Sequence, residues 1–383
     1  MALERVPWPL DPHRATTRDE ALLVKTLLAT PLRVDPQTGD LAPGLCRSWR
    51  RAGAVWTFHC TDAPKVARAI PFGRASVAGD TVRVRLPSPW LRFPYLLTSA
   101  QAAVPGTRGP FEVVRARDGE IVAERGALRL VFRQVEPHRA ALLFRRGELD
   151  EAPVPLGDIR AAQLDARVRA AVRVTRLLGI DAIVLSPRGS LAELPDTINA
   201  YSATLDRGDY QALVPEFQAD AATSLVPGYA PTRVRARDFR AARRQIATLP
   251  PVVFGVGADP EVRYGRDLLV AAWRDVALHA RNGGDDARLR RVLAPYAQDE
   301  ALLAGLYVEG DACVRRALPP ALRELAQAEA LRRADDACSA SVLPLAWVAD
   351  ARFVSPRVQG WREDRLGFVD YARIRFQASS RRP

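Results

Sequence analysis

The chain has 383 residues, of which 48% are hydrophobic and 26% charged, so one to three domains with a large buried core are expected. No run approaches the roughly 18 apolar residues that span a bilayer, and the first residues lack the basic and apolar segments of a secretion signal. The net charge is +12, and the basic residues, nearly all arginine, are spread along the whole chain. This spread favours a solvated surface and argues against nucleic-acid binding, while a polyanion-binding protein remains an alternative.

The four cysteines form two pairs that are close in sequence, Cys46 with Cys60 and Cys313 with Cys338. None has the spacing of a zinc-binding motif, so no metal site is expected. An even number in local pairs favours two disulfides and an oxidising compartment. Four buried free thiols fit the same spacing equally well.

A helix is expected after Thr17, because Thr17 and Glu20 have the spacing of a capping box. Its apolar face repeats at helical intervals, and Pro31 ends it. Residues 41–60 then form two strand-like runs around Gly53, which predicts a β-hairpin. A turn centred on Gly53 puts Cys46 opposite Cys60, whereas a register one step away pairs Trp49 with Trp56 instead. Both registers remain open.

The second half of the chain alternates between strand and helix patterns, which predicts an α/β fold. Strands are expected at Leu177–Leu185 and Val252–Val256, and helices at Leu194–Tyr210 and Tyr264–Arg281. Residues 310–336 are mostly helical. Pro319 and Pro320 break this helical stretch, which would let Cys313 reach Cys338.

Two apolar, strand-forming runs follow near the end of the chain, Val342–Ala349 and Phe368–Phe376. Because this last segment is so apolar, it must be buried against an earlier part of the chain. We expect Phe368–Phe376 to complete a sheet of the N-terminal lobe, so that both ends of the chain belong to one lobe.

Several motifs occur in a fixed order. They are Leu-Asp-Pro-His, then Pro-Leu-x-x-Asp-Pro-x-Thr-Gly-x-Leu-x-Pro-Gly-Leu-x-x-Ser-Trp, Trp-Thr-Phe, Gly-Thr-x-Gly-Pro-Phe and Gly-Glu-x-Asp. In this order the chain resembles the peptide/nickel-type extracellular solute-binding proteins of ABC importers, solute-binding protein family 5, over nearly its whole length. The chain is shorter than most members and lacks their glycine-rich hairpin after Cys60, so the resemblance is to a shortened member with a reduced cleft.

The resemblance implies a two-lobed α/β fold of the periplasmic-binding-protein kind (type II, cluster C-like) with a discontinuous first lobe. Lobe I would comprise 1–178 plus 342–383, and lobe II 179–341. Such a protein would be a monomer that captures a short peptide or other small polar solute in a cleft and presents it to ABC permease subunits. It would act outside the cytoplasm, periplasmic or attached to the cell surface as a lipoprotein, with its leader not present in this chain.

The resemblance also implies ligand-binding residues, on the loop before the first helix, before a second-lobe helix and on the return strand. Each has a plainer interpretation as a cap or a core residue, and capping is the safer one for the threonines. The candidates are Thr16, Thr17, Tyr307, Asp311, Trp347 and Arg352.

No catalytic residue, metal or cofactor is expected. The four histidines lie in four different predicted elements, without a metal-binding or acid–base spacing. Gly255 and Gly257 follow a strand but lack the third glycine of a dinucleotide loop. Besides solute capture for import, a sensor or scaffold domain that keeps the solute-binding fold without transport is the other alternative.

Overall fold

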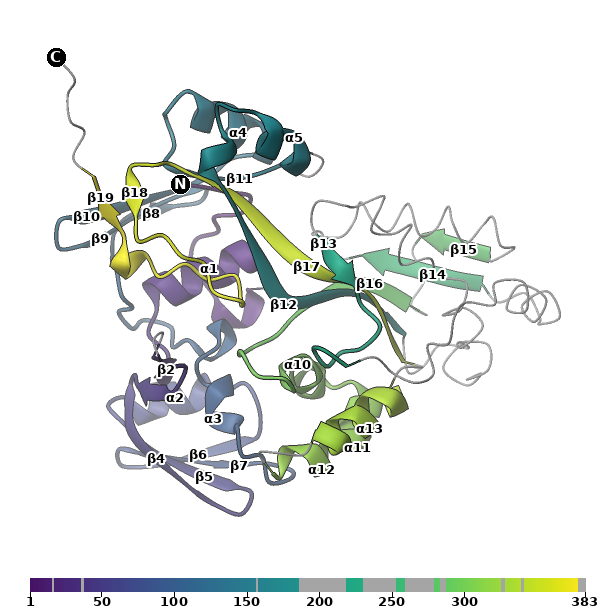
Figure 1. Ribbon diagram of the computed structural model, residues 1–383. Coiled ribbons are helices and arrows are strands. Elements are labelled where there is room, and N and C mark those ends of the chain that lie inside the picture. The colour runs from purple at the N-terminus through teal and green to yellow at the C-terminus, as the bar shows by residue number, and fades with distance from the viewer. Residues whose placement is uncertain are drawn as a thin grey trace. The chain divides into compact units, whose positions relative to one another are not determined.

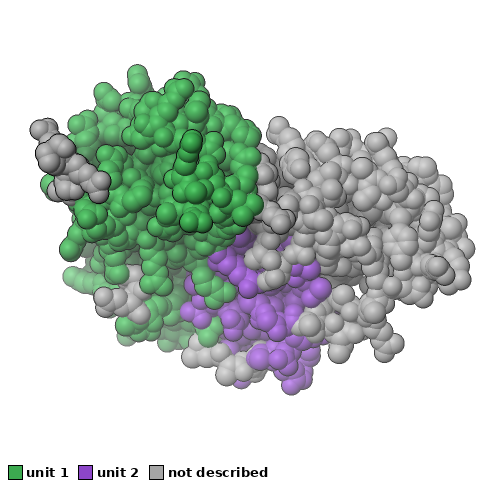
Figure 2. Space-filling model, turned by 45° about the horizontal axis from the view of Figure 1, so that its top comes forward, with its two compact units in different colours: residues 1–175, 350–383 green, residues 176–349 purple. Residues whose placement is uncertain are grey.

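The structure is a computed structural model that describes residues 1–15, 17–35, 38–155, 158–185, 218–229, 253–258, 279–282, 287–324, 328–338 and 341–377. The chain divides into two compact units, residues 1–175 with 350–383 and residues 176–349 (Figure 2). Two long strands, β12 (Val172–Leu185) and β17 (Val342–Val354), run across the division. The boundaries expected from the sequence, 178/179 and 341/342, fall within β12 and at the start of β17.

Unit 1 contains a sheet in the order β1 (Ala2–Leu3), β10 (Leu128–Gln134), β9 (Glu120–Arg125) and β8 (Glu112–Arg117). Its apolar side chains share one core with α1 (Arg18–Leu27) and with the C-terminal segment. That core includes Leu3, Val6, Leu22, Leu23, Phe111, Ile121, Phe132, Val369, Tyr371 and Ile374. The two ends of the chain are therefore held in one core by apolar burial.

The C-terminal segment corrects one expectation. Residues 368–376 pack on the N-terminal core as expected, but they do not form a strand of its sheet. The structure instead has η6 (Tyr371–Arg373) and a two-residue β19 (Arg375–Phe376), which pairs with β18 (Val358–Gln359). Asp370 caps η6 by accepting from the Ala372 amide, 3.2 Å away, and this local bond competes with strand formation.

A second four-stranded sheet of unit 1 has the order β4 (Cys46–Ala52), β5 (Val55–Cys60), β7 (Thr81–Arg85) and β6 (Arg74–Ala78) (Figure 1). Helix α2 (Ala63–Arg68) contacts β5, β6 and β7, and the buried face of the sheet carries Trp56, Phe58, Val82 and Val84. Side chains alternate between this face and solvent, as they must in an extended strand.

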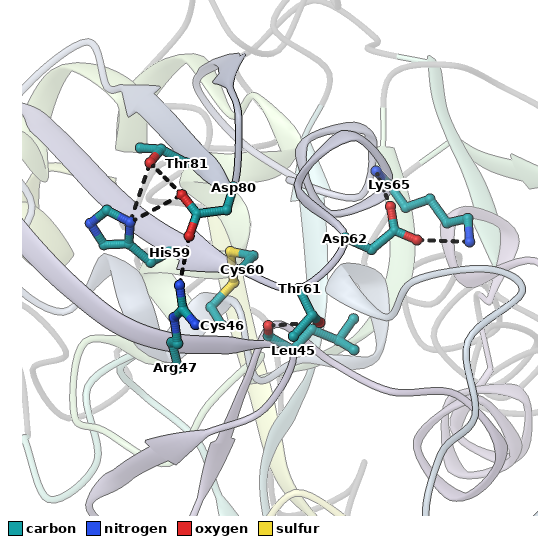
Figure 3. The surroundings of a disulfide bond; sticks show 10 residues. All are labelled: Leu45, Cys46, Arg47, His59, Cys60, Thr61, Asp62, Lys65, Asp80 and Thr81. Carbon is teal, nitrogen blue, oxygen red and sulfur yellow. Dashed lines mark hydrogen bonds and ion pairs between the residues drawn. A yellow bond between two sulfur atoms is a disulfide. The ribbon is translucent and has the colours of Figure 1, made fainter.

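The hairpin β4–β5 resolves the register left open by the sequence. Its two-residue turn pairs Ala52 with Val55 and Trp49 with Phe58, so Trp49 does not face Trp56. A bulge between Cys46 and Ser48 then shifts the register by one residue and places Cys46 opposite Cys60. The two cysteines form a disulfide, which lies beside the His59, Asp80 and Thr81 side chains (Figure 3).

The remaining elements of unit 1 are short connections. They are η1 (Pro12–Arg14), β2 (Leu32–Val34), β3 (Leu41–Pro43), α3 (Phe93–Leu96), η2 (Ala100–Ala102), α4 (Pro137–Arg145), β11 (Glu151–Pro153), α5 (Ile159–Leu164) and η3 (Arg169–Ala171). Strand β11 pairs antiparallel with the part of β17 that belongs to unit 1.

In unit 2 the sheet neighbours follow the order β17, β12, β16 (Ala287–Leu293), β14 (Val253–Ala258) and β15 (His279–Asn282). Strand β13 (Gln218–Ala221) also pairs with β17. The expected strand at Leu177–Leu185 is confirmed within β12, and that at Val252–Val256 is confirmed from Val253 on, since Val252 lies outside the described residues. Gly255 and Gly257 do not follow this strand as expected but lie inside it, because β14 continues to Ala258. The expected helix Tyr264–Arg281 is wrong at its end, because β15 begins at His279; the rest of it, and helix Leu194–Tyr210, lie outside the described residues.

The helical stretch of unit 2 is broken where the sequence predicts. It consists of α10 (Ala301–Glu309), α11 (Ala312–Ala317), α12 (Pro319–Leu322) and α13 (Ala328–Cys338). Pro319 stands at the first position of α12, where a missing amide hydrogen costs nothing. The break brings α11 against α13, and Cys313 forms a disulfide with Cys338. No helix in the described ranges is both long and apolar enough to cross a membrane.

Candidate functional site

A group of buried ionisable side chains lies where β17 enters unit 1, beside the N-terminus of α1. The group joins α1, β11, β17 and the loop after β18, which are far apart in the sequence. We call it the charge cluster; its members are Arg18, Asp19, Glu151, Asp350, Arg352 and Glu363.

Arg352 is the centre of this cluster. Its side chain is only 3% exposed, and its guanidinium nitrogens lie 3.1 Å from Asp19, 3.1 Å from Asp350 and 3.4 Å from Glu151. Burial by itself lowers the pKa of Arg352, but Asp350, Asp19 and Glu151 outweigh it and raise that pKa well above its usual value. Arg352 therefore stays charged and is fully engaged by the protein's own carboxylates.

Arg18 is the second cation, supplied by the first residue of α1. It pairs with Glu363 in a close contact and lies 2.8 Å from Asp350, so one guanidinium bridges the C-terminal loop and β17. Burial and the nearby Arg352 lower the pKa of Arg18, and the carboxylates raise it by more, which leaves it above its usual value.

Asp350 and Glu363 share a hydrogen bond, and their pKa values are shifted in opposite directions. Burial raises the pKa of Asp350, but Arg18 and Arg352 overcome this and lower it to about 2. Burial raises the pKa of Glu363 to about 7 even though Arg18 opposes the shift, because the negative charge of Asp350 and its hydrogen bond to Glu363 raise the pKa further. Near neutral pH the pair therefore holds one permanent negative charge and one group that titrates.

Glu151 is the fixed end of the cluster. One of its oxygens accepts from the Trp361 indole N–H at 3.0 Å, and both accept from the Tyr371 hydroxyl at 3.2 Å. Burial and the Glu151 charge raise the pKa of Tyr371 well above its usual value, so the phenol stays a donor. These bonds tie the C-terminal segment to β11.

The charges of the cluster do not balance. Within these six residues, four carboxyl groups face two guanidiniums, so the six carry about one negative charge when Glu363 is protonated and about two when it is ionised. The Met1 amino group, which interacts with Glu151, offsets part of this charge. Asp350 is the most accessible member, with a side chain that is 15% exposed. A carboxylate with a surplus of negative charge around it is suited to a cationic group such as an ammonium ion, and Asp350 is the member of the cluster that such a group could reach with the least rearrangement.

The structure places the residues predicted from the sequence in two different environments. In unit 1, Thr17 is the N-cap of α1 and forms the predicted capping box with Glu20, with distances of 3.3 and 3.1 Å. Arg352 belongs to the charge cluster, directly beside the residues that follow Thr17. Trp347 lies half-buried on β17. Thr16 lies outside the described residues.

In unit 2, Tyr307 and Asp311 have structural partners. Tyr307 is buried in α10, and its carbonyl accepts from Arg315 at 3.3 Å. Asp311 caps α11 by accepting from the Val314 amide at 2.8 Å. Whether either residue contacts a ligand remains a prediction.

Sequence reasoning missed most of the charge cluster. One signal was present: Asp350 and Arg352 interrupt an otherwise apolar strand, and such charges are buried only when paired. Asp19 fits the first turn of a helix, where acidic residues are ordinary, and nothing local marks Glu151 or Glu363. Their pairing partners are hundreds of residues away.

Two other features of unit 1 bring polar and charged groups together. A cavity of about 230 Å³ in unit 1 is lined by charges of both signs, including Arg129, Arg133, Glu148 and Asp150. Beside the Cys46–Cys60 disulfide, His59 Nδ1 lies 3.2 Å from the Thr81 hydroxyl and 3.6 Å from Asp80, which Arg47 holds at 2.7 Å (Figure 3). This group orders the β6–β7 turn. Among the described residues, no group of three or more side chains is arranged to hold a metal ion.

No protein-family profile and no curated protein sequence matches this chain. Solved structures do. The periplasmic binding protein DppA from Helicobacter pylori, in complex with peptide STSA, has a TM-score of 0.79 at 14% identity, covering 98% of this chain and 97% of that one. The Escherichia coli murein tripeptide binding protein MppA has a TM-score of 0.78 at 12% identity, covering 98% and 97%. Haemophilus influenzae OppA, in complex with RPPGFSPFR, has a TM-score of 0.78 at 15% identity, covering 97% of each chain.

This chain has the fold of the peptide-binding solute-binding proteins. The likeness runs through nearly the whole length of both chains, so it includes both units and the two strands that cross between them in sequence. The motifs in the sequence and the comparison of structures thus indicate the same two-lobed, mixed helix-and-sheet fold.

Proposed function

We propose that this chain is the solute-binding protein of an ABC importer and that it captures a short peptide, or another small solute with an ammonium group, outside the cytoplasm. The observation that carries the proposal is the likeness to solute-binding proteins over 97–98% of the chain. Two of these relatives hold peptides in their structures. On this proposal the chain performs no chemistry of its own and hands its solute to permease subunits.

The charge cluster supports the preference for an ammonium group. A peptide amine needs an ionised carboxylate that stays ionised when water is removed, and the lowered pKa of Asp350 meets that need. Arg18 and Arg352 hold the carboxylate in place without neutralising the whole cluster.

The proposed mechanism uses the two strands that cross the division of the chain. Only two connections, β12 and β17, join the units in sequence, and few connections between lobes are the usual basis of hinge closure. Ligand binding would favour the closed form, which permease subunits would then recognise.

Thermal unfolding in the presence of a peptide library tests the proposal, because a ligand that binds only the folded protein raises the unfolding temperature. We expect peptides of two to nine residues to stabilise the protein, and N-acetylated copies of the same peptides to do so much less. If the unfolding temperature rises with none of the peptides, amines or other small solutes, that result would contradict solute capture.

Variants locate the amine-binding group. Asp350→Asn removes the charge with little change of shape and is expected to weaken peptide binding by tenfold or more in calorimetry, measured well below its unfolding temperature. The matched control is Asp118→Asn, an exposed carboxylate in a turn of the same unit. Equal affinity of both variants would place the amine elsewhere.

A further inference from the structure

The open face of the sheet β4–β5–β7–β6 carries an unusual concentration of arginine. Alternation along the strands gives this face twelve residues, three from each strand. We call it the arginine face; its members are Ser48, Arg50, Ala52, Val55, Thr57, His59, Thr81, Arg83, Arg85, Arg74, Ser76 and Ala78. The opposite face is the buried one, against which α2 packs.

Strand register places the arginines across the sheet rather than along one strand. Arg74 is paired directly with Arg85, and Arg83 lies two residues from Arg85 on the same side of β7. Arg50 is paired with Thr57, which is in turn paired with Arg83. At a spacing of about 4.8 Å between strands, the four guanidiniums share a patch roughly 15 Å across.

This patch has no negative charge of its own. None of the twelve residues is Asp or Glu, and all four arginines are exposed. The nearest carboxylate in the adjoining turn, Asp80, is held by Arg47. Within the described ranges, none of these four arginines forms an ion pair, in contrast to the arginines of β8 and β10, which pair with Glu120 and Glu124. Four like charges placed together without counterions favour an anionic partner.

The chemistry of the face indicates what kind of anion. Guanidinium groups bind phosphate through paired hydrogen bonds. Sheets that bind single-stranded nucleic acid add exposed aromatic rings on which bases stack, whereas Trp56 and Phe58 of this sheet point to the buried side. A broad, exposed face rich in arginine and hydroxyl groups, with no stacking ring except His59, fits a surface of phosphate head groups.

We propose that the arginine face docks on a bilayer that contains anionic phospholipids. The interaction is peripheral and electrostatic, and it is independent of solute capture. Each arginine near such a surface contributes about a fivefold increase in affinity, so four together contribute several hundredfold at physiological salt. Docking would keep the protein at the membrane whether or not its ligand is bound.

Co-sedimentation with vesicles tests this proposal. We expect the full chain to bind vesicles of phosphatidylcholine with 30% phosphatidylglycerol, not to bind pure phosphatidylcholine, and to be released by 0.5 M salt. The variant Arg50→Gln, Arg74→Gln, Arg83→Gln, Arg85→Gln is expected to lose binding by a hundredfold or more. All four positions are exposed, so its unfolding temperature should stay close to that of the parent chain.

The matched control removes the same number of charges from another exposed sheet of unit 1, through Arg115→Gln, Arg117→Gln, Arg129→Gln and Arg133→Gln. It is expected to bind vesicles nearly as well as the parent chain. Equal loss in both variants would mean that only net charge matters and would overturn the proposal. Tighter binding of a 20-nucleotide DNA than of the anionic vesicles at the same salt would overturn it in favour of a nucleic-acid surface.

Discussion

The guanidinium of Arg352 donates a hydrogen bond to the carboxylate of Asp19, 3.1 Å away, although 333 positions separate the two residues in the sequence. This bond ties the end of β17 to the first turn of α1. Because Arg18 and Glu363 extend the same network, the charge cluster connects the start, the middle and the end of unit 1.

Replacing Arg352 with methionine should strongly destabilise the protein. Methionine occupies a volume similar to that of arginine, but it leaves Asp19, Glu151 and Asp350 buried without their shared cation. Breaking a buried ion network by removing one partner typically costs about 3–5 kcal/mol. Urea denaturation followed by circular dichroism measures the loss.

The control for this variant is Arg357→Met. Arg357 lies a short distance along the chain and also pairs with a carboxylate, Asp150, at 2.6 Å, but its side chain is 56% exposed. Solvent screens this pair, so the free energy of unfolding should change by less than about 1 kcal/mol. Similar losses in both variants would show that burial does not distinguish the cluster.

The cluster should also make stability depend on pH near neutrality. Burial raises the pKa of Glu363 to about 7 in the folded protein, above its ordinary value of 4.5. Between these values the folded state holds a proton that the unfolded state releases, so stability falls as the pH rises. The contribution is complete below pH 4.5 and is lost as the pH rises through 7, with a slope of at most about 1.4 kcal/mol per pH unit.

Glu363→Gln should flatten this dependence, because glutamine stays neutral at every pH. Denaturation curves from pH 5 to 8 for the variant, the parent chain and Glu124→Gln, a control whose side chain is 42% exposed, give the comparison. Asp350 acts in the opposite direction: its pKa of about 2 lies below the ordinary 3.8, so its contribution is lost only as the pH falls through 2. If parent and Glu363→Gln curves keep the same slope, Glu363 does not titrate in this range.

Both disulfides should be present in protein made in an oxidising compartment. Intact mass should not change on alkylation without reductant, and four adducts should appear after reduction in denaturant. Cys46→Ala with Cys60→Ala, and Cys313→Ala with Cys338→Ala, should each lower the free energy of unfolding by about 3 kcal/mol, as expected for closing loops of this length. Adducts on the unreduced native protein would contradict the pairing.

Gly109 should not tolerate a side chain. A Cβ atom there would lie 2.6 Å from the Leu27 carbonyl carbon and 2.7 Å from the Leu28 nitrogen, at the end of α1. Both are backbone atoms that cannot move aside, so Gly109→Ala should cost about 1–3 kcal/mol.

Gly305→Ala is the matched control for this substitution. Gly305 lies inside α10, and its nearest new contact would be Pro295 Cδ at 3.4 Å. Alanine is the better helix former by about 1 kcal/mol, so thermal unfolding of this variant should occur at an unchanged or higher temperature. Equal losses at Gly109 and Gly305 would mean that the close approach to α1 is not the cause.

Local features of the fold could be predicted because their causes are local. The capping box of Thr17 and Glu20, the hairpin around Gly53 and the helix break at Pro319 all depend on bonds between residues close in sequence. Apolar runs also predicted β12 and the start of β17. The expectation of a strand over Phe368–Phe376 was wrong. Its apolar side chains are buried in the core, but the segment has no strand partner in that sheet, and Asp370 caps a short helix there instead.

By itself, the sequence predicted a two-lobed α/β fold and the apolar runs that form β12 and the start of β17. It placed the four cysteines in two local pairs, and the tertiary structure decided that each pair forms a disulfide. Tertiary structure alone decided which charges meet. The charge cluster forms because α1, β11, β17 and the loop after β18 meet at one place, which brings together Asp19, Glu151, Arg352 and Glu363. The register of the β4–β5 hairpin depends on a bulge that no local sequence pattern predicts. Likewise, Arg50, Arg74, Arg83 and Arg85 lie on one face only because β4, β5, β7 and β6 pair, since register across strands, not spacing along the chain, sets which side chains are neighbours.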